Sequence, residues 1–461
     1  EPGEWYLNRQ TGTLTYVPHK GETPRNTDII APAALQLLAV TGDAEGQRFV
    51  EHVRFEGITF AHTDWRYPSA DGASIVGPSS ETAPECHSRL YGRGEKAAAM
   101  QASSDVPGVV VFDTARHCSM VDCTIENVGW YAVEIGDACR NVRVQGCTLR
   151  DMGAGGVKIN GASARDSNVK RMCTGKHAIL DNEITEGGRV FHSAVGILAM
   201  HAFGLHIAHN HIHDLFYSGI SCGWEWGYHE HVSCNHLIEF NHIHDIGRGL
   251  LSDMGGIYTL GVQPGTVLRN NLIHGVRSAH YGGMCIYPDQ GSSHILIENN
   301  VCYDTDETVF HQNYGRENVI VNNIFALGAV AAARYSNAEP HVGFTMMRNI
   351  FLSDGVPIFT AGYSYNATSP RHRSDMNLIY DLSGKRPCFV GAEGEKVSLK
   401  RWKELGYDVH SVVADPGFKS LKQRNFALKK DSPAFRIGFK PIDVSTVGPR
   451  PSSKRGTTMS V

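Results

Sequence analysis

The feature that most constrains this sequence is a returning phrase, an asparagine followed by a short apolar run. The phrase begins at seven positions, 23 to 31 residues apart: Asn182, Asn210, Asn241, Asn271, Asn300, Asn323 and Asn349. A period of this length with variable loops is typical of stacked coils, each one turn of a solenoid. Related phrases upstream (GCTLRDM, DCTIENV and EGITFAH) extend the pattern toward the N-terminus. We therefore expect one long repetitive domain rather than several compact ones.

Each repeat carries a second phrase, a short Ile- and Val-rich run next to glycine. GGIYTLG and GGMCIYP are two examples, and both are typical of short strands. No periodic segment long enough for a crossover helix separates these runs, which excludes βαβ units. The sequence thus predicts an all-β fold, a right-handed parallel β-helix. The asparagines are expected to stack into a hydrogen-bonded ladder and to occupy left-handed turn positions.

The two ends of the chain depart from the repeat. GEWYLNRQTGTLTYVP predicts a small β-hairpin module within residues 1–47, ahead of the β-helix at 48–445. Residues 66–105, rich in Pro, Ser, Gly and Ala, predict a long insertion loop. Near the other end, SLKRWKELG predicts a short C-terminal helix over about 398–406 that caps the open end of the stack. The Pro-, Ser- and Lys-rich stretch 446–461 predicts a flexible tail.

Charge and composition exclude several classes of partner. The chain has 43 basic and 47 acidic residues, without the clustered Lys and Arg of a nucleic-acid or anionic-membrane binder. No apolar run reaches the roughly 18 residues that a membrane span requires. The 11 cysteines show no CxxC pairs, so we expect buried thiols rather than zinc sites or a disulfide framework. Nothing in the sequence indicates an oligomeric state.

Several phrases resemble a known group of secreted bacterial β-helix proteins from polysaccharide-degrading systems. The phrases are HTDW at 62–65, LSDMGGIYTLG at 251–261, GGMCIYPDQGSS at 282–293, FHQNYG at 310–315 and NNIFA at 322–326. The chain resembles glycoside hydrolase family 141, which includes an α-L-fucosidase acting on pectin side chains and a xylanase. The likeness covers most of the chain. It is specific to this broad set of β-helix proteins and much less specific to one substrate.

The resemblance implies a glycosidase that acts on an oligo- or polysaccharide of plant or algal origin, in a secreted or periplasmic location. It implies Asp253 and Asp289 as the catalytic pair. The family more often has an acidic residue after the second aspartate, where this chain has Gln290. Such proteins usually begin with further coils before the hairpin module, so the first coils are expected to be missing from this chain.

The repeat itself can bring two carboxyl groups to one edge of a sheet. Glycoside hydrolysis needs such a pair about 5–10 Å apart, one as acid and one as nucleophile or base. If Ile257–Tyr258 stacks on Ile286–Tyr287, Asp289 lies at a strand exit above Leu260. Asp253 is then about 23 Å from Leu260 along an extended chain, so its loop must fold back over the strand. A turn-capping role remains the alternative for each aspartate.

Further residues on the same predicted surface are candidates for binding sugar. Stacking of the strands places His201 and Trp224 in one column, and the loop CGWEWGYHEH adds Glu225 as a third carboxylate. The aromatic rings offer platforms for sugar rings. His311 is expected beside Pro288, next to the second aspartate. The complete set of substrate-binding candidates is His201, Trp224, Glu225, Tyr258, His311 and Tyr314.

Histidines recur in the runs HIAHNHIHD and FNHIHD and superficially suggest a metal site. His213, His244 and His274 fall in one column of the repeat. Coils stack about 4.8 Å apart, whereas metal ligands converge to about 2 Å from the ion. The column is therefore expected to follow from repetition, and neither a metal nor another cofactor is predicted.

Two other functions fit the same fold. A polysaccharide lyase abstracts a proton with a basic residue, for which Lys158 in GGVKING is the candidate, often with calcium held by acidic clusters. No acidic cluster neighbours Lys158 in the sequence. A non-catalytic solenoid would bind glycan along the Trp224 surface without cleaving it. Several titratable residues at adjacent strand exits favour an enzyme.

Overall fold

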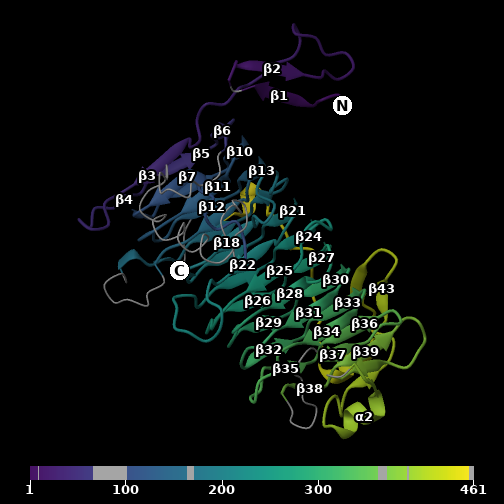
Figure 1. Ribbon diagram of the computed structural model, residues 1–461. Helices are drawn as coiled ribbons and strands as arrows, with labels where there is room; N and C mark the ends of the chain where they lie inside the picture. Colours follow the sequence, from purple (N-terminus) through teal and green to yellow (C-terminus); the bar gives the residue numbers. More distant parts are fainter. Residues whose placement is uncertain (9, 66–100, 163–170, 362–370, 392–393, 456–461) are drawn as a thin grey trace.

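The structure is a computed structural model that describes residues 1–8, 10–65, 101–162, 171–361, 371–391 and 394–455 (Figure 1). It confirms a right-handed parallel β-helix. Successive coils place one strand in each of three long sheets that run the length of the molecule, named sheets I, II and III in their order within a coil. The predicted insertion loop at 66–105 lies almost wholly outside the described residues.

Short strands make up each sheet. Sheet I contains β3 (Leu38–Thr41), β7 (Gly108–Asp113), β11 (Tyr131–Ile135), β14 (Val157–Ile159), β18 (Ile197–Ala199), β22 (Ile220–Cys222), β25 (Met254–Thr259), β28 (Gly283–Pro288), β31 (Thr308–Gln312), β34 (Ala331–Tyr335), β37 (Phe359–Ala361), β40 (Cys388–Val390) and the antiparallel β41 (Lys396–Ser398). Sheet II contains β5 (Arg54–Glu56), β9 (Ser119–Val121), β12 (Arg143–Gln145), β16 (Ala178–Leu180), β20 (His206–Ala208), β23 (Leu237–Glu239), β26 (Val267–Arg269), β29 (Leu296–Glu298), β32 (Asn318–Val321), β35 (Phe344–Met347) and β38 (Arg373–Asp375).

Sheet III contains β6 (Thr59–Ala61), β10 (Thr124–Val128), β13 (Thr148–Met152), β17 (Glu183–Ile184), β21 (His211–Leu215), β24 (His242–Ile246), β27 (Leu272–Val276), β30 (Val301–Thr305), β33 (Ile324–Gly328), β36 (Ile350–Ser353), β39 (Leu378–Asp381) and β42 (Val412–Val413). Smaller pairs are β1 (Trp5–Asn8) with β2 (Thr13–Tyr16), β4 (Val50–Glu51) with β8 (Ala115–Arg116), β15 (Thr174–Gly175) with β19 (Ala202–Phe203), and β43 (Phe418–Ser420) with β44 (Asn425–Leu428).

The core is a continuous apolar column enclosed by the three sheets. Along sheet I, Ile197, Ile220, Ile257, Ile286 and Phe310 occupy equivalent positions of successive strands. All five side chains are fully buried. Each isoleucine removed from water contributes about 1.5–3 kcal/mol, so every coil adds its own increment of stability. This register also fixes which residues meet at the strand ends.

The asparagine ladder is confirmed at the turn between sheets II and III. Asn241 is representative, because its Nδ2 donates to Asn271 Oδ1 at 3.0 Å and to the Ile207 carbonyl at 2.9 Å. Equivalent bonds link all seven predicted asparagines, and Asn377 adds one more. The expectation that these asparagines are themselves left-handed was wrong. The preceding residue takes that conformation, as Phe240 does with φ 53°.

The hairpin is present at the N-terminus as two antiparallel strands, β1 and β2. Its aromatic residues are largely exposed, Trp5 to 68% and Tyr6 to 66%. The segment that follows is not part of a separate module, because β3 pairs with β7 in sheet I. The β-helix therefore begins before residue 48, the predicted boundary.

The short C-terminal helix is confirmed as α2 (Leu399–Glu404). Ser398 Oγ accepts a hydrogen bond from the Arg401 amide at 3.3 Å and caps the helix. Trp402 is buried and stacks on Phe389 of β40, the last parallel strand of sheet I. The helix thus covers apolar side chains at the end of the solenoid.

The predicted flexible tail is instead attached to the β-helix as far as Arg455. Residues 440–455, which we name the C-terminal strap, run back along the solenoid toward its first coils (Figure 1, yellow). A short 3-10 turn at Pro433–Ile437 precedes the strap, and another at Ser452–Lys454 lies within it. Its contacts follow in reverse chain order: Lys440 with Asn322, Gly448 with Phe240, Arg450 with Asp181 and Arg455 with Asp122.

The cysteines of the described part are free thiols and most are buried, which agrees with the prediction of core thiols. Among these same residues, no helix has the length and apolar character needed to cross a membrane.

Candidate active site

The two predicted aspartates lie at the ends of neighbouring strands of sheet I. Asp253 directly precedes β25, and Asp289 directly follows β28. The predicted register is confirmed, since Ile257 pairs with Ile286 and Tyr258 with Tyr287. We refer to Asp253 and Asp289 as the aspartate pair.

Two tyrosine side chains connect the aspartate pair along the sheet. The Tyr287 hydroxyl donates to Asp253 Oδ1 at 3.2 Å, and the Tyr258 hydroxyl donates to Asp289 Oδ2. The rings of Tyr258 and Tyr287 are 5.2 Å apart in an edge-to-face contact. The phenol side chains therefore connect the two carboxyl groups, a connection that we expected the loop before β25 to provide by folding back over the strand.

The two carboxyl groups lie in different electrostatic surroundings. Burial, together with the negative charge of Asp289, raises the pKa of Asp253 to about 6, against the lowering effect of the Tyr287 hydrogen bond. Burial also raises the pKa of Asp289, but hydrogen bonds from Tyr258, Asn313 and the backbone stabilise its ionised form. The Asn313 contact is 2.7 Å. Asp253 is therefore suited to hold a proton and Asp289 to carry the charge.

The backbone at Asp253 is held in an uncommon conformation. Its φ is 62°, in the left-handed region that Asp and Asn tolerate better than most residues. The Tyr217 hydroxyl donates to the Asp253 carbonyl at 2.8 Å, and Gln101 Nε2 donates to the same oxygen at 3.3 Å. The Asp253 amide donates to the Tyr281 carbonyl at 3.1 Å. These bonds fix the position from which the carboxyl group projects.

The site opens toward solvent on the Asp253 side. Asp289 is only 4% exposed, whereas Tyr281 is 54% exposed. The Tyr281 carbonyl accepts a hydrogen bond from the Asp253 amide at 3.1 Å, so Tyr281 adjoins Asp253. An exposed ring beside the aspartate pair provides a surface on which a sugar ring could lie.

The predicted aromatic loop lies against the Asp289 end of the site. The Gly227 amide donates to the Gln290 carbonyl at 3.4 Å, and the Tyr314 hydroxyl donates to Gln290 Oε1 at 3.1 Å. Trp226 packs against the cluster that contains Tyr258 and Tyr287. Trp224, Glu225 and Trp226 are all half-buried, and the Trp224 ring is 5.1 Å from that of Trp226. A substrate role for Trp224 and Glu225 stays a prediction.

The placement predicted for His311 was wrong by one residue. Phe310 pairs with Ile286, so His311 stacks on Tyr287 with ring centres 4.8 Å apart rather than lying beside Pro288. Its Nε2 lies 2.9 Å from Ser336 Oγ. Burial and the charge of Arg334 lower its pKa to about 3, so the ring is neutral. His311 therefore supports the ring of Tyr287.

His201 is not brought to the aspartate pair. It does share the predicted column with Trp224, because Ile197 pairs with Ile220. It follows β18, however, which is three strands from β28 in sheet I. That separation corresponds to about 14 Å at the usual strand spacing.

Sequence reasoning missed Tyr287, Asn313 and Tyr217. A signal for Tyr287 was available, because the dipeptide Ile-Tyr occurs at the same register in β25 and β28. Tyr217 comes from the loop before β22, and only the folded chain shows that it reaches the Asp253 carbonyl.

The residue proposed as a lyase base is occupied by other contacts. Lys158 is buried and pairs with Glu134 at 3.0 Å, and its Nζ donates to the Val106 carbonyl at 2.7 Å. These contacts hold Lys158 Nζ inside the protein, where a substrate cannot reach it. Groups with metal-ligand spacing in the described residues lie on sheet III, away from the aspartate pair.

Comparison with known proteins supports the fold and finds one similar structure with a described activity. The family model for the right-handed β-helix region matches residues 107–253. A solved structure described as a glycoside hydrolase is 25% identical, with a TM-score of 0.59, over 70% of this chain and 56% of its own. This chain thus spans a little over half the length of that protein. No curated protein matches it.

Two further solved structures are more distant. One is the complex of XylC with xylose, at 12% identity and a TM-score of 0.35, covering 63% of this chain and 49% of its own. The other is a mannuronic acid specific polysaccharide family 6 lyase from human gut microbiota. It has 12% identity and a TM-score of 0.40, covering 67% of this chain and 83% of its own. Both overlap this chain too loosely for a functional comparison. The protein is a right-handed β-helix protein similar to a glycoside hydrolase.

Proposed function

We propose that the protein is a glycoside hydrolase that cleaves a plant or algal polysaccharide, with Asp253 as general acid and Asp289 as nucleophile or base. The observation that carries this proposal is the aspartate pair itself. The half-buried carboxyl group of Asp253 and the buried one of Asp289 are linked through Tyr258 and Tyr287 along sheet I, and they differ in what stabilises their charge. Paired carboxyls with separated proton affinities are what glycosidic cleavage requires.

The chemistry follows from this difference. Asp253, with a pKa of about 6, can deliver a proton to the leaving glycosidic oxygen in mildly acidic solution. Asp289, held as a carboxylate by Tyr258 and Asn313, can attack the anomeric carbon or activate a water. An α-L-fucoside or a xylan is the first substrate to test, because these are the activities known in the family that the sequence resembles.

The test compares wild-type protein with Asp253→Asn and Asp289→Asn on fucosylated pectin fragments and xylans, following reducing ends and free sugar. A substitution that preserves shape but removes the carboxyl group should lower turnover about a thousandfold, the usual scale of acid–base catalysis. Asp381→Asn is the matched control, since Asp381 is a buried aspartate on sheet III that accepts from the Gly355 and Ser383 amides. Full activity in either site variant would remove that residue from the mechanism.

The same assay separates the competing functions. A lyase product contains a new C=C bond that absorbs in the near ultraviolet, whereas hydrolysis yields none. Glycan binding without product formation by the wild type would favour the non-catalytic solenoid. The occupied state of Lys158 speaks against the lyase with that residue as base.

A further inference from the structure

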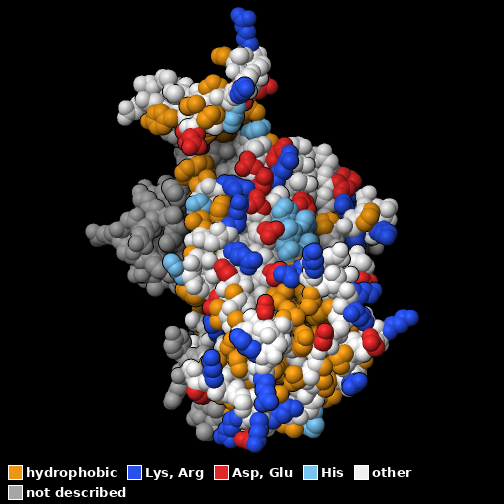
Figure 2. Space-filling model, turned by 90° about the vertical axis from the view of Figure 1, so that its right-hand side faces the viewer, with side chains coloured by type: hydrophobic (Ala, Val, Ile, Leu, Met, Phe, Trp, Pro, Cys, Tyr) orange, Lys and Arg blue, Asp and Glu red, His pale blue; other side chains and the backbone are white. Residues whose placement is uncertain are grey.

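Histidine rings cover the outer face of sheet III in two parallel columns. The strands β21 and β24 each contribute two histidines in register, with His211 beside His242 and His213 beside His244. His274 of β27 continues the second column. Figure 2 shows histidine side chains gathered in one patch on this face, with acidic side chains next to them. This patch belongs to a different sheet from the aspartate pair.

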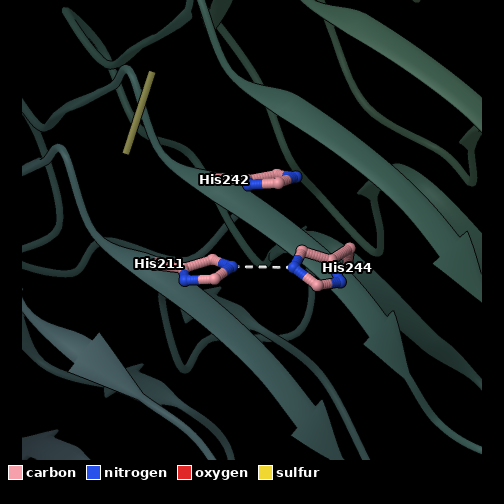
Figure 3. A group of neighbouring side chains, drawn as sticks. All are labelled: His211, His242 and His244. Carbon is pink, nitrogen blue, oxygen red and sulfur yellow. Dashed lines mark hydrogen bonds between the residues drawn. The ribbon is translucent and has the colours of Figure 1, made fainter. Parts of the chain in front are cut away.

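Rings within one column stack and do not converge. The His213 and His244 rings are 5.1 Å apart and nearly parallel at 3°, and those of His244 and His274 are 5.0 Å apart at 6°. This is the spacing on which the sequence analysis based its expectation of no metal. Convergence occurs diagonally between the columns, where His211 Nε2 and His244 Nε2 are 2.7 Å apart (Figure 3).

A third imidazole lies beside this diagonal contact. The ring centre of His242 is 5.0 Å from that of His211 and 4.4 Å from that of His244. One ligand atom from each of the three residues lies within 4.8 Å of the others. We name His211, His242 and His244 the histidine cluster. Its members are half-buried, so water and ions can reach them.

The carboxylates around the cluster determine which ring nitrogens carry protons. His211 Nδ1 is 2.8 Å from Glu183 Oε2, and His244 Nδ1 is 2.8 Å from Asp245 Oδ2. An ionised carboxylate only accepts hydrogen bonds, so each Nδ1 is the donor. In a neutral ring the Nε2 atom then presents a lone pair. Two lone pairs that face each other at 2.7 Å require a cation between them, either a shared proton or a metal ion.

We propose that the histidine cluster binds one divalent transition-metal ion, with zinc as the reference ion. His211 Nε2 and His244 Nε2 are the first two ligands and His242 is the third, while Glu183 and Asp245 orient their rings. Imidazole nitrogen suits zinc, copper and nickel, and a carboxylate on the other ring nitrogen is the usual outer partner of such ligands. Four-coordinate zinc at about 2.0–2.1 Å places its ligand nitrogens about 3.3 Å apart, so the rings separate slightly on binding.

The ion would link two adjacent coils through β21 and β24. Its role is then structural, a cross-link on the outside of the solenoid. The proposal is independent of the glycosidase proposal, because the ligands lie on sheet III and the aspartate pair lies on sheet I.

The experiment uses full-length protein without a histidine tag, stripped with a chelator and then dialysed against Zn²⁺. We expect one zinc per chain by elemental analysis after gel filtration, and a rise of about 3 °C or more in the unfolding midpoint with excess zinc. With Cu²⁺ in place of zinc, the electron paramagnetic resonance spectrum should show coupling to two or three nitrogen nuclei. His211→Gln and His244→Gln should each weaken zinc binding at least about tenfold.

His294→Gln is the control, since His294 is an exposed histidine elsewhere on the surface that pairs with Glu317 at 3.5 Å. It should bind zinc as the wild type does. Circular dichroism checks that every variant retains its β structure. Failure of the wild-type protein to retain zinc would overturn the proposal, because the facing nitrogens would then share a proton. Unchanged binding in the His211→Gln and His244→Gln double variant would overturn it equally.

Discussion

At the scale of single residues, the main finding concerns how two aspartates at opposite ends of neighbouring strands come together. A long stretch of backbone separates them in the sequence, and the strand register alone does not bring their side chains into contact. The Tyr287 hydroxyl reaches the Asp253 carboxyl group and the Tyr258 hydroxyl reaches that of Asp289. Asp253 and Asp289 are candidates because the family resemblance implies them, and each adjoins a strand that carries the repeated Gly-Gly motif. The bridging depends on side-chain directions that periodicity does not describe.

Asp253→Asn should stabilise the fold in neutral solution. The folded protein raises the pKa of Asp253 from about 3.9 to about 6, so it binds this proton more tightly than the unfolded chain. Stability is therefore lost as the pH rises from about 4 to 6. Removing the charge should raise the free energy of unfolding by about 1–3 kcal/mol at pH 7 and change it little at pH 4. Asparagine also tolerates the left-handed backbone at this position.

Denaturant unfolding of wild type and Asp253→Asn at the two pH values provides the measurement. An equal difference at pH 4 and pH 7 would show that the carboxyl group is not destabilised by its surroundings.

At the scale of elements, the turn between sheets II and III divides its tasks between two consecutive residues. The first takes the left-handed conformation and the second joins the ladder, as Asn270 and Asn271 do. Both residues are asparagine in this coil, so their identity does not indicate which one is left-handed and which one joins the ladder. Other coils of the ladder indicate this, because Phe240 and Met376 occupy the first position and asparagine follows each of them.

The same substitution at these two neighbours should have different effects. Asn271→Gly removes the acceptor for the Asn241 amide and side chain and the donor to the Ile238 carbonyl, all buried. Leaving such groups unpaired costs about 1–3 kcal/mol each, so we expect a loss of about 3 kcal/mol or more. Asn270→Gly places glycine at φ 54°, which it adopts freely, and should change stability by less than about 1 kcal/mol. The midpoints of urea unfolding compare the two variants. Equal losses of stability would show that the ladder hydrogen bonds do not stabilise the fold.

At the scale of the whole molecule, the C-terminal strap links the last part of the chain to the first coils. Its composition predicted a flexible tail, because Pro, Ser and Lys seldom form a core. The strap needs no core of its own, since it lies on a surface that the β-helix already provides. Asp181 has a fully buried side chain, and Arg450 pairs with it through two contacts of 2.8 Å. Pairing between residues so far apart in the chain leaves no local pattern in the sequence.

Arg450→Gln should destabilise the protein by about 3 kcal/mol at neutral pH, because the Asp181 carboxylate is left buried without its cation. Burial raises the pKa of Asp181, but the bonds and charge of Arg450 and the bond from Gln145 outweigh it and lower the pKa overall. The contribution is therefore present above the unfolded pKa of about 3.9 and is lost as the pH falls through the lower, folded value.

Thermal unfolding at several pH values measures this effect. Arg401→Gln serves as the control, since its pair with Glu404 at 3.3 Å is largely exposed and should contribute less than about 1 kcal/mol. A destabilisation by Arg450→Gln no larger than that of the control would mean that the strap is not held by this ion pair.

The most direct test of the catalytic assignment is the pH dependence of kcat/KM on a glycan that the wild-type protein cleaves. Asp253 must be protonated to act as the acid, so activity should fall as the pH rises through about 6. The acidic limb should lie above the ordinary aspartate range, because the pKa of Asp289 is also raised. In Asp253→Asn the residual activity should lack the limb near pH 6. A wild-type profile that stays flat from pH 5 to pH 8, or a variant that keeps the same limb, would contradict the account.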